Sequence, residues 1–132
     1  QTMTLAEFLT REPTDYRPPS LTGRVLFHGH CHHKSVLGTA ADVSLLRRAG
    51  LTVEAPDTGC CGMAGSFGFK KRHYDVSVAV GEQAMLPAVR DWPGEQAIVT
   101  DGFSCREQVR QLTGREPRHL AELLACASQD DD

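Results

Sequence analysis

The sequence lacks a long apolar run. No stretch approaches the roughly 20 consecutive apolar residues that a membrane-spanning helix needs, so we expect no transmembrane segment. It also lacks an excess of positive charge, because 14 Lys and Arg residues stand against 17 Asp and Glu residues. The resulting net charge of -3 gives no electrostatic basis for binding nucleic acid. The length of 132 residues and the 40% hydrophobic content are typical of one globular domain.

A secretory signal is absent as well. The first residues, Gln1-Thr-Met-Thr-Leu-Ala-Glu7, contain no basic region and no apolar core, and no initiator Met stands at position 1. We therefore expect a piece of a larger protein. Five cysteines are an odd number for a disulfide framework, and a reducing compartment with metal-binding thiolates is the better hypothesis. The predicted location is the cytoplasm, with the inner face of a membrane as a further possibility.

Three short apolar segments predict the strands of a parallel sheet. They span residues 24–28, 51–55 and 97–100, and a helical pattern follows each of them. The alternation predicts an α/β fold: a small three-layer parallel sheet of three or four strands, in the order 2-1-3, with helices on both faces. Any fourth strand is expected beyond the third.

The helices are predicted from caps and glycine stops. Capping boxes at Thr39–Asp42 and Ser104–Glu107 indicate where two helices begin. Glycines end both, Gly50 after the first and Gly114 after the second. A longer helical stretch over residues 74–92 should bend or split at Gly81 and Pro87. A last helix is expected over residues 120–127.

The two ends of the chain suggest the domain boundaries. Residues 1–20 read as a helix and a proline-rich linker left from a preceding module, residues 21–127 as the cysteine-rich domain, and residues 128–132 as a disordered tail. The segment Leu5-Ala-Glu-Phe-Leu9 resembles Leu120-Ala-Glu-Leu-Leu124. This repetition fits an opening helix that closes a related, preceding domain.

Four cysteines follow the ends of the predicted strands. Cys31 comes after the first strand, Cys60 and Cys61 after the second, and Cys105 after the third, at the predicted first residue of its helix. Because the carboxyl ends of parallel strands share one edge of a sheet, we expect the four thiols to meet there. Thiolates are the ligands of zinc and of iron–sulfur clusters, so the sequence predicts a metal or cluster site.

Histidines surround the first of these cysteines. His30, His32 or His33 is a candidate ligand, or a hydrogen-bond donor to a bound sulfur. His73 and His119 are predicted to be structural, and Cys126 is predicted to be a small core residue on the last helix. A catalytic Cys–His pair is a further hypothesis, but it leaves the adjacent cysteines unexplained.

One alternative reading of the glycine-rich loop fails. The glycines at 62, 65 and 68 follow a strand but have the wrong spacing for a dinucleotide-binding fingerprint, and two cysteines occupy the turn.

Three segments together resemble a known family. They are His28-x-x-Cys31-His32, Gly59-Cys-Cys-Gly-Met-Ala-Gly-Ser-Phe-Gly68 and Asp101-Gly-Phe-Ser-Cys105. This set, spread over residues 20–125, is similar to the cysteine-rich CCG domain of heterodisulfide reductase and glycolate oxidase iron–sulfur subunits. It is most similar to the C-terminal part of FAD-linked oxidases of the D-lactate and D-2-hydroxyglutarate dehydrogenase type.

The resemblance implies an electron-transfer role. FAD would be bound only by a flavin domain elsewhere in the parent protein, and a ferredoxin-like domain would be a second partner within that chain. This domain would hold a 4Fe–4S cluster through Cys31, Cys60, Cys61 and Cys105, with His30 and His32 as additional candidates. It would pass electrons from the flavin to an unidentified acceptor and would not be catalytic in isolation.

The sequence departs from the family pattern at one position. The pattern closes with Cys-x-x-Cys, whereas here Gln108 stands three residues after Cys105. A five-cysteine site therefore cannot be assembled in the same way. A four-cysteine cubane, a zinc site and a site completed by histidine remain open, and the alternative functions are a structural zinc domain or a thiol-dependent enzyme.

Overall fold

Three short parallel strands form the centre of the molecule. The computed structural model describes residues 2–11 and 15–127. Strands β1 (Arg24–Phe27), β2 (Thr52–Glu54) and β3 (Ala97–Val99) pair in the order β2-β1-β3. This order is the predicted one. A single parallel bridge joins Val99 to Arg118, at the place where a fourth strand was expected.

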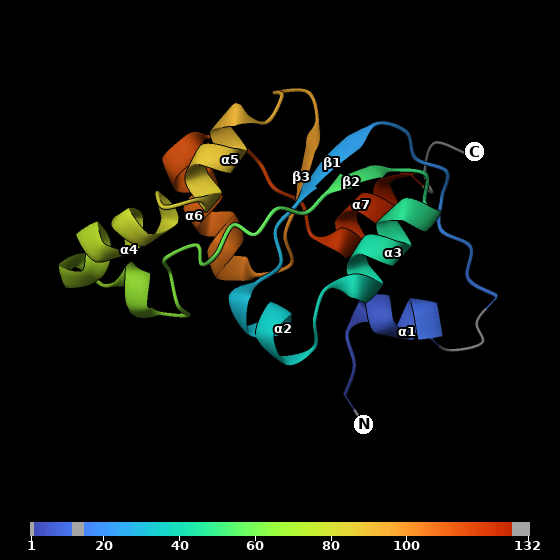
Figure 1. The fold of residues 1–132 in the computed structure, drawn as a ribbon, viewed down its shortest axis with the longest axis horizontal. Coiled ribbons are helices and arrows are strands. Elements are labelled where there is room, and N and C mark those ends of the chain that lie inside the picture. Colours follow the sequence, from blue (N-terminus) through green and yellow to red (C-terminus); the bar gives the residue numbers. More distant parts are fainter. Residues whose placement is uncertain (1, 12–14, 128–132) are drawn as a thin grey trace.

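Helices cover both faces of this sheet, as predicted (Figure 1). The helices are α1 (Leu5–Arg11), α2 (Cys31–Val36), α3 (Ala40–Arg48), α4 (Tyr74–Gly81), α5 (Met85–Asp91), α6 (Phe103–Thr113) and α7 (Leu120–Ala127), with two short 3-10 turns, η1 (Phe67–Phe69) and η2 (Lys71–His73). Among the described residues, no helix has the length and apolarity needed to cross a membrane.

Alternating side chains of β1 build two separate cores. Val25 and Phe27 pack on one face with residues of α1, α3 and α7. Leu26 points to the other face, where it packs with residues of α5 and α6. This alternation is the ordinary period of a strand, and it leaves β1 buried on both sides.

The interruption predicted in the 74–92 stretch is present. Helix α4 ends at Gly81 and α5 begins at Met85, so the break lies at the glycine. Pro87 is the third residue of α5, inside the first turn, where its missing N–H has no helical acceptor to lose. The proline therefore fits within α5.

Of the two predicted N-caps, Thr39 is confirmed in position and Ser104 is wrong. Thr39 precedes α3, but its side chain makes no capping hydrogen bond, and Asp42 is buried instead. Helix α6 begins two residues earlier than predicted, with Gly102 as its N-cap, and Ser104 donates its hydroxyl to the carbonyl of Gly65 at 3.2 Å. At Ser104 a tertiary contact takes the side chain that the local pattern assigned to the cap.

The similar sequences of α1 and α7 begin in the same way. The carboxylate of Glu7 accepts the backbone N–H of Thr4 at 2.9 Å, and that of Glu122 accepts the N–H of His119 at 2.7 Å. Helix α1 packs into the core through the buried Ala6. The proposed boundary at residue 20 stays a prediction, and the predicted disordered tail at 128–132 lies outside the described residues.

The loop that carries the two adjacent cysteines presses closely on α4. Gly62 has φ of +91°, and a Cβ placed there would lie 1.9 Å from the carbonyl oxygen of Ser77. A Cβ at Gly81 would lie 2.8 Å from the carbonyl oxygen of Cys61. Two glycines on opposite sides of the contact therefore let the loop and the helix meet backbone to backbone.

This contact predicts different effects for two glycine substitutions. Gly62→Ala and Gly59→Ala both place a side chain at positive φ, which costs about 1–2 kcal/mol. Only in Gly62→Ala does the new side chain also meet a backbone atom, since the space beside Gly59 is open to 4 Å. We therefore expect Gly62→Ala to lose roughly a further 1–3 kcal/mol or more of the free energy of unfolding. Urea unfolding of the two variants measures the difference. Equal losses would contradict the close packing of the loop on α4.

Candidate cysteine site

The four predicted cysteines lie at the carboxyl edge of the sheet, each after its strand. Cys31 is the first residue of α2, and Cys60 and Cys61 lie in the loop after β2. Cys105 is the third residue of α6, not the first as predicted. Helix α2 was not predicted, because its sequence, Cys-His-His-Lys-Ser-Val, has no apolar periodicity.

The structure brings these four side chains into contact with one another. The thiols lie close enough to shift one another's pKa: Cys61 is affected by Cys105 and Cys60, and Cys60 by Cys61 and Cys31. Cys61 and Cys105 are 3% and 1% exposed, whereas Cys31 and Cys60 are partly exposed. The group therefore has an inner pair and an outer pair, and the outer pair faces solvent.

Hydrogen bonds make Cys61 the acidic member of the group. The Cys105 thiol, the backbone N–H groups of Met63 and Ala64, and the Cys60 thiol lower the pKa of Cys61 to about 6 despite its burial. Hydrogen bonding to Cys61 and burial raise the pKa of Cys105. One thiolate held by several donors is the charge state that this arrangement favours.

Cys60 is less acidic. Burial raises the pKa of its thiol, and the N–H of Gly62, whose nitrogen lies 3.3 Å from its sulfur, only partly offsets this effect.

The three neighbouring histidines occupy different environments. His30 lies beside Cys105: a Cβ at Gly102 would be 2.6 Å from His30 Cδ2 and 3.1 Å from Cys105 Sγ. His32 is exposed. His33 turns to α3, where its Nε2 lies 3.4 Å from the Asp42 carboxylate. Of the three, His30 is the one that the structure brings next to a candidate cysteine.

Another histidine contributes to the site, and sequence reasoning gave it no role. His28 is buried at the end of β1 and shares a hydrogen bond with Thr58, two residues before Cys60. Burial lowers its pKa to about 4, so it is neutral near pH 7. The position of His28 after an apolar strand is the only sequence signal for this role, and the partner in the next loop becomes visible only in the fold.

Of the remaining single-residue predictions, two are confirmed and one is wrong. His73 is structural, as predicted, because its ring stacks on Phe67 and its Nδ1 lies 3.0 Å from the Phe67 carbonyl oxygen. His119 likewise accepts the N–H of Ala121 within the first turn of α7. The prediction for Cys126 is wrong: it is exposed on α7, because the buried face of that helix is formed by Leu120, Leu123 and Leu124.

The possible ligands at this sheet edge are thiols, which as thiolates can bind zinc or an iron–sulfur cluster. Within the described residues, no three or more His, Cys, Asp or Glu side chains are placed so that they could hold a metal ion. An iron–sulfur cluster is held at its corners and needs thiolates from several sides, and loops after three strands supply them here. A Cβ at position 102 would clash with His30 and crowd the Cys105 sulfur, so the glycine lets these two side chains approach the start of α6.

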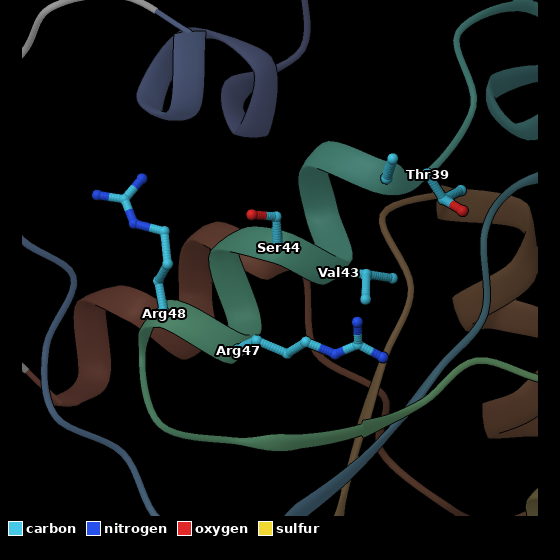
Figure 2. A pocket seen from close by; sticks show the side chains of 6 residues that line it. Thr39, Val43, Ser44, Arg47 and Arg48 are labelled. Carbon is cyan, nitrogen blue, oxygen red and sulfur yellow. The ribbon is translucent and has the colours of Figure 1, made fainter.

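A surface depression of the described residues lies away from the cysteines. It has a volume of about 750 Å³ and is lined by residues of α3 and its N-cap, among them Thr39, Val43 and Arg47 (Figure 2). In Figure 2 the side chains of Arg47 and Arg48 extend in different directions, so their charges do not converge. No cysteine lines it, and the chemistry therefore points to the sheet edge.

Comparisons with known proteins identify relatives for most of the chain. One component of the anaerobic glycerol-3-phosphate dehydrogenase of Escherichia coli K12 is 36% identical over 105 residues, which is 79% of this chain and 26% of that protein. The D-2-hydroxyglutarate dehydrogenase of Escherichia coli K12 is 33% identical over 100 residues, 74% of this chain and 10% of that enzyme. The chain is a relative of part of these dehydrogenases. The predicted resemblance is thereby confirmed.

A third relative extends the match. The D-2-hydroxyglutarate dehydrogenase of Pseudomonas putida KT2440 is 32% identical over 113 residues, 84% of this chain and 11% of that enzyme. The chain thus spans about a quarter or less of the curated relatives it matches. No protein-family model and no solved structure matches it.

The Cys61 environment predicts an early thiolate. In metal-free, reduced protein, ultraviolet thiolate absorbance should rise by one group with a midpoint at about pH 6, since hydrogen bonds lower the pKa of Cys61 to about 6. Cys61→Ser should abolish this step, and Cys126→Ser, which removes an exposed thiol, should leave it intact. A first thiolate step above pH 8 in the wild type would contradict the hydrogen-bonding pattern.

Asp42 predicts a loss of stability as pH rises. Burial raises its pKa to about 6, with His33 lowering it and Asp101 and Glu7 raising it. An acid whose folded pKa is raised stabilises the fold below the unfolded value, near pH 4, and that contribution is lost as pH rises through about 6. Between these pH values the free energy of unfolding, measured with urea, should fall by about 1–3 kcal/mol less in Asp42→Asn than in the wild type. A variant with the same pH profile as the wild type would contradict the role of Asp42.

Proposed function

We propose that this chain is an electron-transfer module that binds a 4Fe–4S cluster through Cys31, Cys60, Cys61 and Cys105. The observation that carries the proposal is the contact of four thiols from three loops at one sheet edge. The parent protein would be an FAD-linked 2-hydroxy-acid dehydrogenase. Its flavin would supply electrons, and the short share of each relative that this chain spans supports a role as one part of a longer enzyme.

The cluster, when bound, would accept and release single electrons. The protein supplies the ligands and their surroundings. Cys61 already favours the thiolate, and the N–H groups of Met63 and Ala64 point to its sulfur and would offset negative charge there. The burial of Cys61 and Cys105 keeps water from one side of the group, while the partly exposed Cys31 and Cys60 face the side from which a partner can approach.

A thiol enzyme is less well supported. A nucleophilic cysteine needs a lowered pKa together with access to substrate. Cys61 has the lowered pKa, but it is only 3% exposed, and another cysteine is the first cause of its acidity. These features fit a ligand better than a nucleophile. A zinc domain remains an outcome of the experiment below.

Anaerobic reconstitution tests the proposal directly. Protein incubated with ferrous iron, sulfide and reductant should become brown and retain about four iron atoms per chain after desalting. Cys61→Ser and Cys105→Ser should lower the iron content by more than half. Cys126→Ser is the matched control, since that thiol is exposed on α7, and it should bind as much iron as the wild type.

Two outcomes would contradict the proposal. One is a folded wild-type protein, shown by circular dichroism, that binds no iron. The other is about one zinc per chain with no bound sulfide, which would indicate the structural zinc domain.

A further inference from the structure

Gln108 is buried between the cysteine loop and α4. Its side chain is 4% exposed, one turn after Cys105 on α6. Its Nε2 donates to the carbonyl oxygen of Cys61 at 3.0 Å. It also lies 3.3 Å from the carbonyl oxygen and 3.2 Å from the hydroxyl of Ser77, which is itself buried on α4. One amide group thus joins α6 to the backbone of both the cysteine loop and α4.

We propose that Gln108 is a positioning residue, which holds the Cys60-Cys61 loop in place and completes a site of four cysteine ligands. The inference rests on the proposed function for its redox meaning, whereas the positioning itself does not need a cluster. Gln108 acts through Cys61. Its amide binds the Cys61 carbonyl, and the orientation of the Cys61 backbone decides where the Cys61 sulfur points.

The two carbonyls that Gln108 binds lie at the tightest part of the fold. The Ser77 carbonyl is the one that a Cβ at Gly62 would strike, and the Cys61 carbonyl is the one that a Cβ at Gly81 would approach. The loop and α4 therefore bring carbonyl oxygens into a buried space where a donor is needed. An amide has two N–H groups and can satisfy both.

Other side chains at position 108 would not do this. A carboxylate would place oxygen against two carbonyl oxygens. A cysteine is shorter and offers one weak donor, so it would leave the Cys61 carbonyl without its partner. Position 108 can therefore carry either an amide that binds the two carbonyls or a cysteine that serves as a fifth ligand. In this chain it carries the amide.

The position of Gln108 also connects two candidate ligands. It shares α6 with Cys105, which is buried in the same cluster as Cys61, and it binds the backbone of Cys61 from the next turn of the same helix. Movement of the loop away from α6 would separate the two inner sulfurs. It would also withdraw the N–H groups of Met63 and Ala64 from Cys61.

Thiol accessibility in the metal-free, reduced chain tests this inference. Gln108→Met keeps the length of the side chain and removes the donor, and Gln111→Met is the matched control on the exposed side of α6. Under limiting iodoacetamide, mass spectrometry gives the alkylation rate of Cys61 relative to the exposed Cys126. Gln108→Met should raise this ratio about tenfold, because a lost buried hydrogen bond lets the loop open, and Gln111→Met should leave it unchanged.

A second variant guards against misfolding. Ser77→Ala removes the hydroxyl acceptor and keeps both carbonyls, so it should raise the ratio in the same direction by a smaller factor. The inference is overturned if the folded variants leave the ratio at the wild-type value. It is also overturned if Gln111→Met raises the ratio as much as Gln108→Met, which would indicate general loosening of α6.

The reconstituted protein provides a readout that a purely structural role would not change. Gln108→Met should shift the reduction potential and the electron paramagnetic resonance signal of the cluster, and Gln111→Met should not. An unshifted potential in a fully loaded Gln108→Met protein would overturn the positioning role. If the wild type binds no iron, the proposed function fails, while the alkylation ratio still decides whether Gln108 holds the loop.

Discussion

The parallel pairing of β1 with both neighbours is the constraint on which the rest of this structure depends. Because β2 and β3 run in the same direction as β1, the three following loops emerge at one edge. Cysteines that are up to 74 residues apart in sequence, at 31 and 105, become neighbours for that reason alone. The sheet has only three short strands, so its stability comes from the two cores that β1 separates.

The cysteines at the sheet edge differ in pKa, and this difference limits the repulsion among them. Four thiolates close together would repel one another strongly, and four neutral thiols would gain little from their contacts. Hydrogen bonds from two thiols and two peptide groups concentrate negative charge on Cys61, and Cys105 keeps its proton. Loading of a cluster would replace this internal arrangement with metal–sulfur bonds and release protons.

The sheet, its order and the edge that carries the cysteines could be predicted from sequence, because apolar runs and glycine stops are local signals. The signal for the break between α4 and α5, the glycine at position 81, was also local. Helix α2 could not be predicted because its sequence has no apolar periodicity. The burial of Asp42 and the contact of Ser104 with Gly65 could not be predicted because they arise only when the elements pack together. Gln108 stood out in the sequence only as a missing cysteine, and its actual contacts, with residues 61 and 77, required the fold.

The close approach of Gly62 to α4 has a consequence for how such sequences diverge. Gly62, next to the paired cysteines, packs directly against the backbone of Ser77. Packing alone therefore requires a glycine at this position, whether or not the cysteines bind a metal or a cluster. A descendant that lost its cofactor would still need that glycine in order to fold. Gly62 can therefore persist for packing reasons alone, whereas a Cβ at Gly59 or Gly65 would meet no atom within 4 Å, so these two positions carry no such requirement.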